Sequence, residues 1–399
     1  MAKLSVDELD LGGKRVFLRV DFNVPLDGGR VTDDTRIRAA LPTIQHCLSA
    51  GAALVIASHL GRPKGKPDPA FSLRPAADRL GELLGRPVPL APDCVGPEVE
   101  AEAKALRPGE ILLLENLRYH REEEDNDEGF ARGLAALADV YVNDAFAAAH
   151  RAHASIEAIT RFLRPAAAGR LMQSELDALG RIFERPERPL LAVLGGAKVS
   201  DKLTLVEHVL DRVDGVLVGG GMAFTFLRAL GYGTGRSLVE PDRVDAAQTV
   251  LAKARTRGVP VRLPVDVVVA AGLDAPSGRV VGIRDIPPDL MGLDVGPATV
   301  AQFADALGRA RTIVWNGPMG VFEREPFAAG TVGVARAVTA SGAFSVVGGG
   351  DTIAAAEAAG VTGKLGYIST AGGAFLEFLE GRVLPGVAAL DPAPAPAHS

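Results

Sequence analysis

The first half of the sequence carries arginine, histidine and acidic or amide side chains in short motifs that each follow an apolar run. These motifs read VDFNVP, SHLGRP, ENLRYH and NDAFAAAHRAHAS, and a further arginine lies in TDDTRIRAA. A guanidinium group can hold two oxygens of a phosphate or carboxylate at once, so a cluster of arginines suits a small anion that carries both groups. The candidate residues are Asp21, Asn23, Arg36, His59, Arg62, Arg118 and Arg151. Each arginine taken alone fits a solvated loop position equally well, but their recurrence favours an anion site.

The second half carries glycine-rich motifs instead, which read LGGAKVSDK, VGGGMAF, WNGPMGVFE and VGGGDT. Three of them lead into a predicted helix, so backbone N–H groups and the positive end of each helix would face a phosphate group. A single glycine-rich turn is as often only a tight packing arrangement, whereas four along one sheet edge favour nucleotide binding. Lys198 and Lys202 would add positive charge, and they would lie one turn apart if the helix begins near them.

Asp351 directly follows the last glycine run, at a predicted helix start. Its carboxylate can serve a Mg²⁺ ion that is held mainly by phosphate and water, because this ion takes only one or two protein carboxylates. Aspartate at such a position is also a common N-cap. Both roles remain open from the sequence.

Several other kinds of site lack their signatures. The sequence contains neither GxxxxGK followed by Ser or Thr nor GxGxxG, which argues against a P-loop fold and a simple dinucleotide-binding oxidoreductase. No GxSxG or other nucleophile motif supports covalent catalysis. His150 and His153 are three residues apart but have no evident third ligand, so anion contacts or packing are favoured over a metal. Cys47 and Cys94 have no metal-ligand spacing, which fits reduced thiols.

These motifs need parallel sheets to position them, because ligands of open parallel sheets lie outside the carboxyl ends of the strands. Apolar, β-branched runs alternate with longer Ala- and Leu-rich periodic segments, which is the pattern of βαβ units. The predicted strands are residues 15–20, 53–57, 110–114 and 140–142 in the first half and 190–194, 215–218, 312–315 and 344–347 in the second. The sequence therefore predicts an α/β protein with two doubly wound, Rossmann-like parallel-sheet domains.

The chain has 399 residues, more than a single hydrophobic core usually serves. Residues 171–185 read as an amphipathic helix, and the Pro-punctuated ERPERP follows it, so we place the domain boundary there. The formal charge of −6 argues against a nucleic-acid or acidic membrane partner. The first ten residues lack a secretory pattern and no window reads as a membrane span, so we expect a cytoplasmic protein.

Taken together, the motifs resemble those of the phosphoglycerate kinase family over nearly the whole chain. The residues that carry the resemblance read RVDFNVPL, SHLGRPKG, LLLENLRYH, AHRAHAS, LGGAKVSDK, GGGMAFTFL, MGLDVGP, WNGPMGVFE, GGGDTIAA and STAGGAFLEFLEG. The resemblance implies a Mg²⁺-dependent kinase that reversibly transfers a phosphoryl group from 1,3-bisphosphoglycerate to ADP, giving 3-phosphoglycerate and ATP. It also implies a monomer whose two domains close on each other through a hinge.

The resemblance assigns the domains as well. Residues 1–170, together with about 372–390, would bind 3-phosphoglycerate. Residues 171–187 would form the interdomain helix and linker, residues 188–371 would bind the nucleotide, and residues 391–399 would be a flexible tail. The hinge candidates are the helix at residues 171–185 and the turn at residues 369–373.

Carried over by motif, the substrate site is the same set of seven residues that the arginine-bearing motifs indicate. The nucleotide site would consist of Lys202, Gly220, Gly221, Gly292, Val321, Glu323, Gly349, Gly350, Asp351 and Thr352. Asp351 would serve the metal, and Arg36, Lys198 and Lys202 would be the catalytic residues that stabilise the transferring phosphoryl group. Ala147 and Ala371 stand where the family usually has glycine, which puts local loop flexibility in doubt.

Two competing functions remain open. The same scaffold could transfer phosphate to a different small acid, and an acceptor panel distinguishes that enzyme. Alternatively, the chain could be a noncatalytic nucleotide or metabolite sensor, although pure binding does not require both Arg36 and Lys198.

Overall fold

The computed structural model describes residues 2–200 and 202–394, and it divides into two compact units. Unit 1 comprises the described residues up to Asp177 together with those from Val383 onward, and unit 2 comprises Ala178–Arg382. Helix α6 (Arg170–Phe183) carries the chain from one unit to the other. The helix expected at residues 171–185 is therefore present, and the tail expected at residues 391–399 lies partly outside the described residues. Among the described residues, no helix is both long and apolar enough to cross a bilayer.

Unit 1 is built on a five-stranded parallel sheet with the strand order β5-β4-β1-β6-β7. Its strands are β1 (Arg15–Arg19), β4 (Ala53–Ala57), β5 (Ile111–Leu113), β6 (Val140–Asn143) and β7 (Ala166–Ala168). A hairpin of β2 (Leu26–Asp27) and β3 (Arg30–Val31) follows β1. The sheet strands are almost entirely buried, as their apolar sequences predict for strands covered on both faces.

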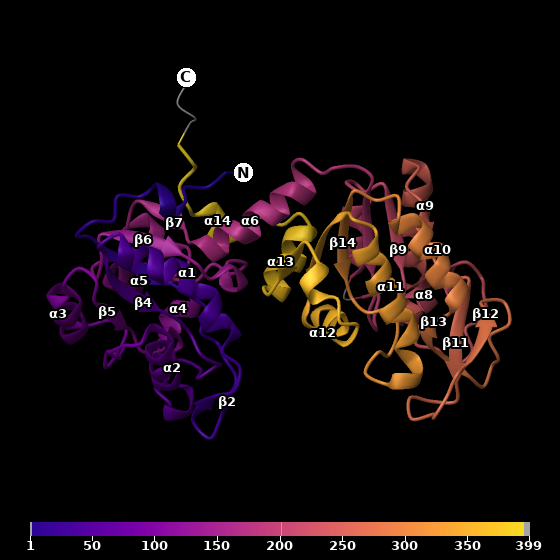
Figure 1. The fold of residues 1–399 in the computed structure, drawn as a ribbon, viewed down its shortest axis with the longest axis horizontal. Helices are drawn as coiled ribbons and strands as arrows, with labels where there is room; N and C mark the ends of the chain where they lie inside the picture. Colours follow the sequence, from indigo (N-terminus) through magenta and orange to yellow (C-terminus); the bar gives the residue numbers. More distant parts are fainter. Residues whose placement is uncertain (1, 201, 395–399) are drawn as a thin grey trace. The chain divides into compact units, whose positions relative to one another are not determined.

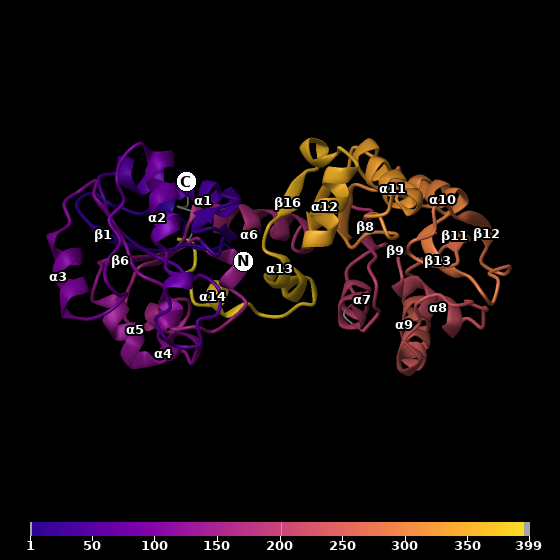
Figure 2. The same ribbon diagram turned by 90° about the horizontal axis from the view of Figure 1, so that it is seen from below.

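Helices cover both faces of this sheet (Figure 2), with α1 and α2 on one side and α4 and α5 on the other. The helices of unit 1 are α1 (Thr35–Ser49), α2 (Arg74–Leu84), α3 (Pro97–Ala105), α4 (Arg121–Glu124), α5 (Glu128–Ala135) and α14 (Pro385–Ala388). Short 3₁₀ helices join them: η1 (Val6–Glu8), η2 (Pro69–Phe71), η3 (Leu117–Tyr119), η4 (Phe146–Ala148) and η5 (Ala158–Arg161). The core forms where Val16, Leu18 and Ile56 of the sheet meet Ile37 and Ile44 of α1.

Unit 2 contains a six-stranded parallel sheet with the order β10-β9-β8-β14-β15-β16 and a three-stranded antiparallel sheet with the order β12-β11-β13. The strands are β8 (Leu190–Leu194), β9 (Gly215–Val218), β10 (Val261–Arg262), β11 (Asp266–Ala270), β12 (Arg279–Gly282), β13 (Met291–Val295), β14 (Thr312–Asn316), β15 (Phe344–Gly348) and β16 (Tyr367–Ser369).

Helices again lie on both faces of the large sheet, with α7, α8 and α9 on one side and α10, α11 and α12 on the other (Figure 2). Their bounds are α7 (Leu203–Val209), α8 (Met222–Ala229), α9 (Val244–Arg257), α10 (Pro297–Leu307), α11 (Ala329–Ala340), α12 (Gly350–Ala358) and α13 (Gly372–Leu379), with the 3₁₀ helices η6 (Pro241–Arg243), η7 (Glu325–Phe327) and η8 (Thr362–Lys364). Figure 1 shows these elements in chain order. The predicted fold class, two doubly wound parallel-sheet domains, is confirmed.

The sequence did not predict the three-stranded antiparallel sheet of unit 2, nor the edge strands β7 and β16. The three alanines of β7 have low strand propensity, so the sequence gives no strand signal there. Helix α13, assigned from the sequence to the first domain, packs in unit 2 against α7 and β15. Phe378 of α13 packs against Phe183 of α6 with tilted rings whose centroids are 5.6 Å apart, and this apolar contact helps to hold α13 in unit 2.

Candidate functional site

The loop after β1 carries Asp21 and Asn23, and the first turn of α1 brings Arg36 to them at the carboxyl end of the unit 1 sheet. Nη1 of Arg36 donates to Oδ2 of Asp21 over 2.6 Å, and the backbone N–H of Asn23 donates to Oδ1 of the same carboxylate over 3.1 Å. The Arg36 side chain keeps 39% of its surface exposed. Its guanidinium is therefore held by one partner and still accessible to an anion.

Gly61, in the SHLGRP motif after β4, connects Asn23 with Arg118. Its N–H donates to Oδ1 of Asn23 over 2.9 Å, and its carbonyl accepts from Nη1 of Arg118 over 2.9 Å. Only glycine fits here, because its φ is +59° and a Cβ would lie 2.4 Å from the Phe71 ring. The structure thus brings together residues from the motifs after β1, β4 and β5.

His59 is buried beneath this edge and is held by a buried arginine. Its Nδ1 lies 3.3 Å from Nη2 of Arg19, and Arg19 can only donate, so Nδ1 accepts and we assign the ring proton to Nε2. Burial lowers the pKa of His59 well below its ordinary value, and the nearby charges of Arg19 and Arg118 lower it further. His59 is therefore a neutral hydrogen-bond donor through Nε2 at physiological pH.

A buried polar cluster below the edge consists of Arg19, Glu123 and Ser155, which the sequence analysis did not identify. Nε of Arg19 donates to Oγ of Ser155 over 2.8 Å, and Ser155 donates to Glu123 through its hydroxyl (2.6 Å) and its N–H (2.9 Å). Burial raises the pKa of Glu123, and the charge of Arg19 opposes this shift. One signal was available, because Arg19 is a charged residue that directly follows the apolar, buried run Val16–Leu18 in the same strand.

The remaining basic candidates differ in their setting. Arg118 is 8% exposed, and burial lowers the pKa of its guanidinium, with Arg19 and Arg151 adding repulsion. Arg151 is exposed but close enough to act on Arg118 electrostatically. Arg62 is also exposed, and no hydrogen bond or ion pair found among residues 2–200 joins its side chain to the others. His153 is buried, and desolvation lowers its pKa to about 3, which agrees with packing, one of the two roles favoured for it over a metal.

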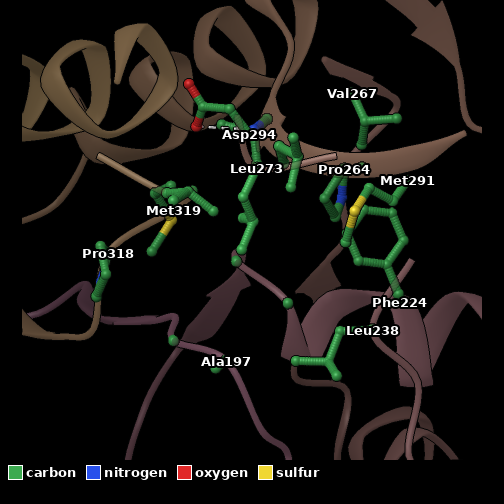
Figure 3. Close-up of a pocket in the computed structure, with 18 of the residues that line it drawn as sticks. Ala197, Phe224, Leu238, Pro264, Val267, Leu273, Met291, Asp294, Pro318 and Met319 are labelled. Carbon is green, nitrogen blue, oxygen red and sulfur yellow. Dashed lines mark hydrogen bonds between the residues drawn. The ribbon is translucent and has the colours of Figure 1, made fainter. Parts of the chain in front are cut away.

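Unit 2 contains a cavity of about 410 Å³ whose walls come from both of its sheets (Figure 3). Six of the predicted nucleotide residues line it: Gly220, Gly221, Gly292, Val321, Glu323 and Asp351. Apolar side chains make up much of the remaining wall, namely Phe224, Leu238, Pro264, Met291 and Met319. A cavity of this size and lining suits a flat, largely apolar ring with a few polar edges.

Gly292 lines this cavity beside Phe224. A Cβ at this position would lie 2.0 Å from Cζ of Phe224, which is far inside contact distance. Its backbone N–H donates to Oγ of Ser237 over 2.9 Å, so the strand cannot shift freely away from the ring. Glycine is therefore required here for space.

Lys202 lies at the carboxyl ends of β8 and β14, where its Nζ donates to the carbonyls of Gly195 (2.5 Å) and Asn316 (3.1 Å). Helix α7 begins only at Leu203, so Lys198 lies in the exposed loop before it. The described residues between β8 and α7 are not helical, so the two lysines are not one helical turn apart, which corrects the conditional prediction.

The N-terminus of α12 is capped by Gly349, whose φ is +96°. Asp351 lies in the first helical turn instead and makes no capping hydrogen bond, so the N-cap interpretation was wrong. The side chain of Thr352 is buried and accepts the N–H of Gly317 over 2.7 Å. Asp351 is exposed and lines the cavity, so its carboxylate is free to meet a cation or phosphate-bound metal.

Asp294 also lines the cavity but fits a metal poorly. Its carboxylate is 3% exposed and accepts the N–H groups of Gly330 (2.6 Å) and Val295 (2.9 Å). Burial raises its pKa to about 7. The sequence analysis did not identify it as a site residue, although a carboxylate inside the β13 strand was a visible signal.

Comparisons with known proteins agree with this architecture. The phosphoglycerate kinase family model matches residues 6–382. A phosphoglycerate kinase of Moorella thermoacetica is 59% identical over 392 residues, covering 98% of this chain and 99% of the relative, and one of Desulfosudis oleivorans is 54% identical over 389 residues, covering 97% and 98%.

Solved structures agree as well. The phosphoglycerate kinase structure from Coxiella burnetii matches with a TM-score of 0.92 and 46% identity, covering 97% of this chain and 98% of that one. The structure from Pyrococcus horikoshii matches with a TM-score of 0.81 and 38% identity over the same shares of the two chains. On the strength of its two sheets, its paired sites and these full-length matches, the chain belongs to the phosphoglycerate kinase family.

Proposed function

We propose that unit 1 binds the phosphoglycerate and unit 2 the nucleotide in the reaction of this family. In that reaction, a phosphoryl group passes reversibly from 1,3-bisphosphoglycerate to ADP, giving 3-phosphoglycerate and ATP. The chain is a phosphotransferase. The observation that best supports assigning the nucleotide to unit 2 is its cavity, where six of the predicted nucleotide residues surround one apolar slot.

In unit 1, the phosphoglycerate would be held by the seven residues predicted from the sequence. Arg36 supplies an accessible guanidinium, while Arg118 supplies one that is partly desolvated and therefore interacts more strongly with an anion. His59 would donate from Nε2 as a neutral group. Arg62 and Arg151 are exposed and would turn onto the ligand's phosphate.

In unit 2, the adenine ring would enter the apolar slot beside Gly220, Gly221, Gly292 and Val321, and Glu323 would hold the ribose hydroxyls. The phosphates would then extend toward the glycine motifs and the N-terminus of α12, at Gly349, Gly350 and Thr352. Lys202 would exchange its contacts with backbone carbonyls for phosphate oxygens. Asp351 would hold Mg²⁺, which supplies positive charge to the phosphate oxygens when it is bound.

The transfer itself requires no proton movement in the direction of ATP formation. An oxygen of the ADP β-phosphate attacks the phosphorus of the acyl phosphate, the bond from phosphorus to the acyl oxygen breaks, and this oxygen leaves as the carboxylate of 3-phosphoglycerate. Negative charge spreads over the equatorial oxygens in flight, so positive groups around them lower the barrier. Arg36 and Lys198 would provide this charge, with Lys202 on the nucleotide side.

The reacting groups must meet, and we expect domain closure to bring them together and to exclude water that would hydrolyse the acyl phosphate. Helix α6 and residues 369–373 are the expected hinges. Small-angle scattering should report a smaller radius of gyration when both substrates are added. An unchanged curve with saturating ligands would contradict closure. We further expect a monomer that acts in the cytoplasm.

The function is tested by a coupled assay with ATP, Mg²⁺ and a panel of small acids, in which acyl-phosphate formation is read by a reductive dehydrogenase step. The account predicts turnover with 3-phosphoglycerate and little with other three-carbon acids. Turnover with another acid in preference would identify a different phosphotransferase. Folded protein that binds ADP but turns over no acid would support the noncatalytic sensor.

A further inference from the structure

Asp93, Cys94 and His120 lie together at the end of β5, and none of them belongs to the substrate or nucleotide sites described above. One ligand atom from each lies within 4.8 Å of the other two. Nε2 of His120 is 2.7 Å from Oδ1 of Asp93. Among the described residues, this is the one group of three such side chains that comes close enough to surround an ion.

The backbone around these three side chains is fixed by hydrogen bonds to β5 and the turn that follows it. The segment before α3 runs beside the strand, with the N–H of Ala91 donating to the carbonyl of Leu113 over 2.8 Å and that of Glu115 donating to the carbonyl of Asp93 over 3.3 Å. The His120 ring lies against Phe130 with centroids 5.1 Å apart. The ligands are therefore held before any ion arrives, which reduces the entropy cost of binding.

One side of the cluster is buried in the protein, and the other side is exposed to solvent. Cys94 is fully buried, whereas the side chains of His120 and Asp93 are 28% and 44% exposed and leave an entry path from solvent. The nearby charges are negative, because Glu122 acts on His120 and Glu123 acts on Cys94. Such surroundings favour a cation.

We propose that Asp93, Cys94 and His120 form a binding site for a borderline-soft divalent cation of the Zn²⁺ class. A thiolate, an imidazole and a carboxylate are ligands that Zn²⁺ accepts together, whereas Mg²⁺ and Ca²⁺ take oxygen ligands. Three protein ligands leave a fourth position for water. When the ion binds, the Cys94 thiol gives its proton to solvent and the His120–Asp93 hydrogen bond opens to admit the ion.

A bound ion would tie two separate segments together. His120 directly follows η3, which carries Arg118, and Asp93 and Cys94 precede α3. The simpler interpretation is a surface histidine–aspartate pair beside an unreactive core thiol. The two interpretations differ in whether the Cys94 sulfur bonds a metal, which absorption spectroscopy measures directly.

The test uses the full chain after chelator treatment, titrated with Co²⁺ as a spectroscopic substitute for Zn²⁺. The proposal predicts a near-ultraviolet thiolate-to-cobalt band that saturates at one ion per chain and disappears when Zn²⁺ is added. Cys94→Ser should abolish the band. Cys47→Ser is the matched control, because Cys47 is also a buried free cysteine but has no such ligand set among residues 2–200 and 202–394, and it should keep the band.

His120→Gln provides a second variant at a half-exposed position, where folding is less at risk. It should weaken Zn²⁺ binding at least about tenfold in calorimetry, and Zn²⁺ should no longer raise the Tm as it does in the unmodified chain. A thiolate band that is absent from the unmodified chain, or that survives Cys94→Ser, would overturn the proposal. Unchanged Zn²⁺ affinity in His120→Gln would also overturn it.

Discussion

The space inside the unit 2 cavity depends on glycines in its wall, which have no side chain, and Gly292 is the clearest case. Gly292→Ala places a methyl group 2.0 Å from Cζ of Phe224, so the ring must move into the space proposed for adenine. We expect ADP affinity to fall at least about tenfold, as measured by calorimetry. Gly363→Ala is the control, because a Cβ there meets nothing within 4 Å, and its ADP affinity should be unchanged. If both variants bind ADP with equal affinity, the proposal that adenine occupies this slot is contradicted.

His153 predicts a specific pH dependence of stability in unit 1. Burial lowers its folded-state pKa to about 3, below its ordinary value of 6.5, so below pH 6.5 the unfolded chain binds a proton that the folded chain does not bind. This contribution to stability is therefore present above pH 6.5 and is lost as the pH falls. Between pH 7 and pH 5, the free energy of unfolding should drop by about 2 kcal/mol more in the unmodified chain than in His153→Gln. Unfolding free energies are measured by denaturant titration at both pH values. If the free energy falls by the same amount in the unmodified chain and in His153→Gln, the assignment is contradicted.

The sequence predicted the polar residues that follow the apolar runs, including the buried His59 and Arg118, but it did not predict the buried cluster of Arg19, Glu123 and Ser155. Asp21, Asn23 and Arg36 were predicted because polar residues after apolar runs stand out in a sequence, and the structure gathers them. Glu123 and Ser155 could not be predicted, because they come from a helix and a loop that only the tertiary fold brings beneath β1. The Asp93, Cys94 and His120 cluster was missed for the same reason, since His120 lies 26 residues beyond Cys94 along the chain.

Strand β1 ends in the buried guanidinium of Arg19, and the stability of unit 1 depends on the partners of this side chain. Arg19→Leu removes the positive charge that offsets Glu123, leaving a buried carboxylate without compensation. We expect a loss of about 3–5 kcal/mol in unfolding free energy, measured by denaturant titration.

The double variant Arg19→Leu/Glu123→Gln tests the cause of that loss. Removing both charges should recover part of the stability, because no uncompensated charge is left. If the double variant loses the sum of the two single losses, the side chains act independently and the coupling inferred for this cluster is wrong.

Elements with strong patterns were predictable from the sequence, while those defined by their neighbours were not. Strands β1, β4, β8 and β9 are apolar runs bounded by turn residues, and their positions agree with the prediction. Strand β7 is three alanines, and it is a strand only because β6 offers it an edge. Helix α13 has an apolar face that suits either unit, so its packing against α7 could not be deduced from local sequence.

In the molecule as a whole, one unit is formed by two separate chain segments and the other by a single segment. Unit 1 is assembled from two separated stretches, whereas unit 2 is continuous and contains all the residues that line the cavity proposed for the nucleotide. A fragment of residues 170–382 should therefore fold cooperatively and bind ADP within a few-fold of the full chain's affinity. Circular dichroism melting and calorimetry check both points. A fragment that folds without binding ADP would show that the cavity needs unit 1.

The most direct test of the central claim measures turnover and binding side by side in Arg36→Ala and Lys198→Ala. If these side chains stabilise the phosphoryl group in transfer, kcat for ATP and 3-phosphoglycerate should fall about 10²–10³-fold in each variant, while the Kd for ADP in both remains close to that of the unmodified chain. Variants that turn over at the original rate, or that lose activity only through weakened substrate binding, would contradict the account.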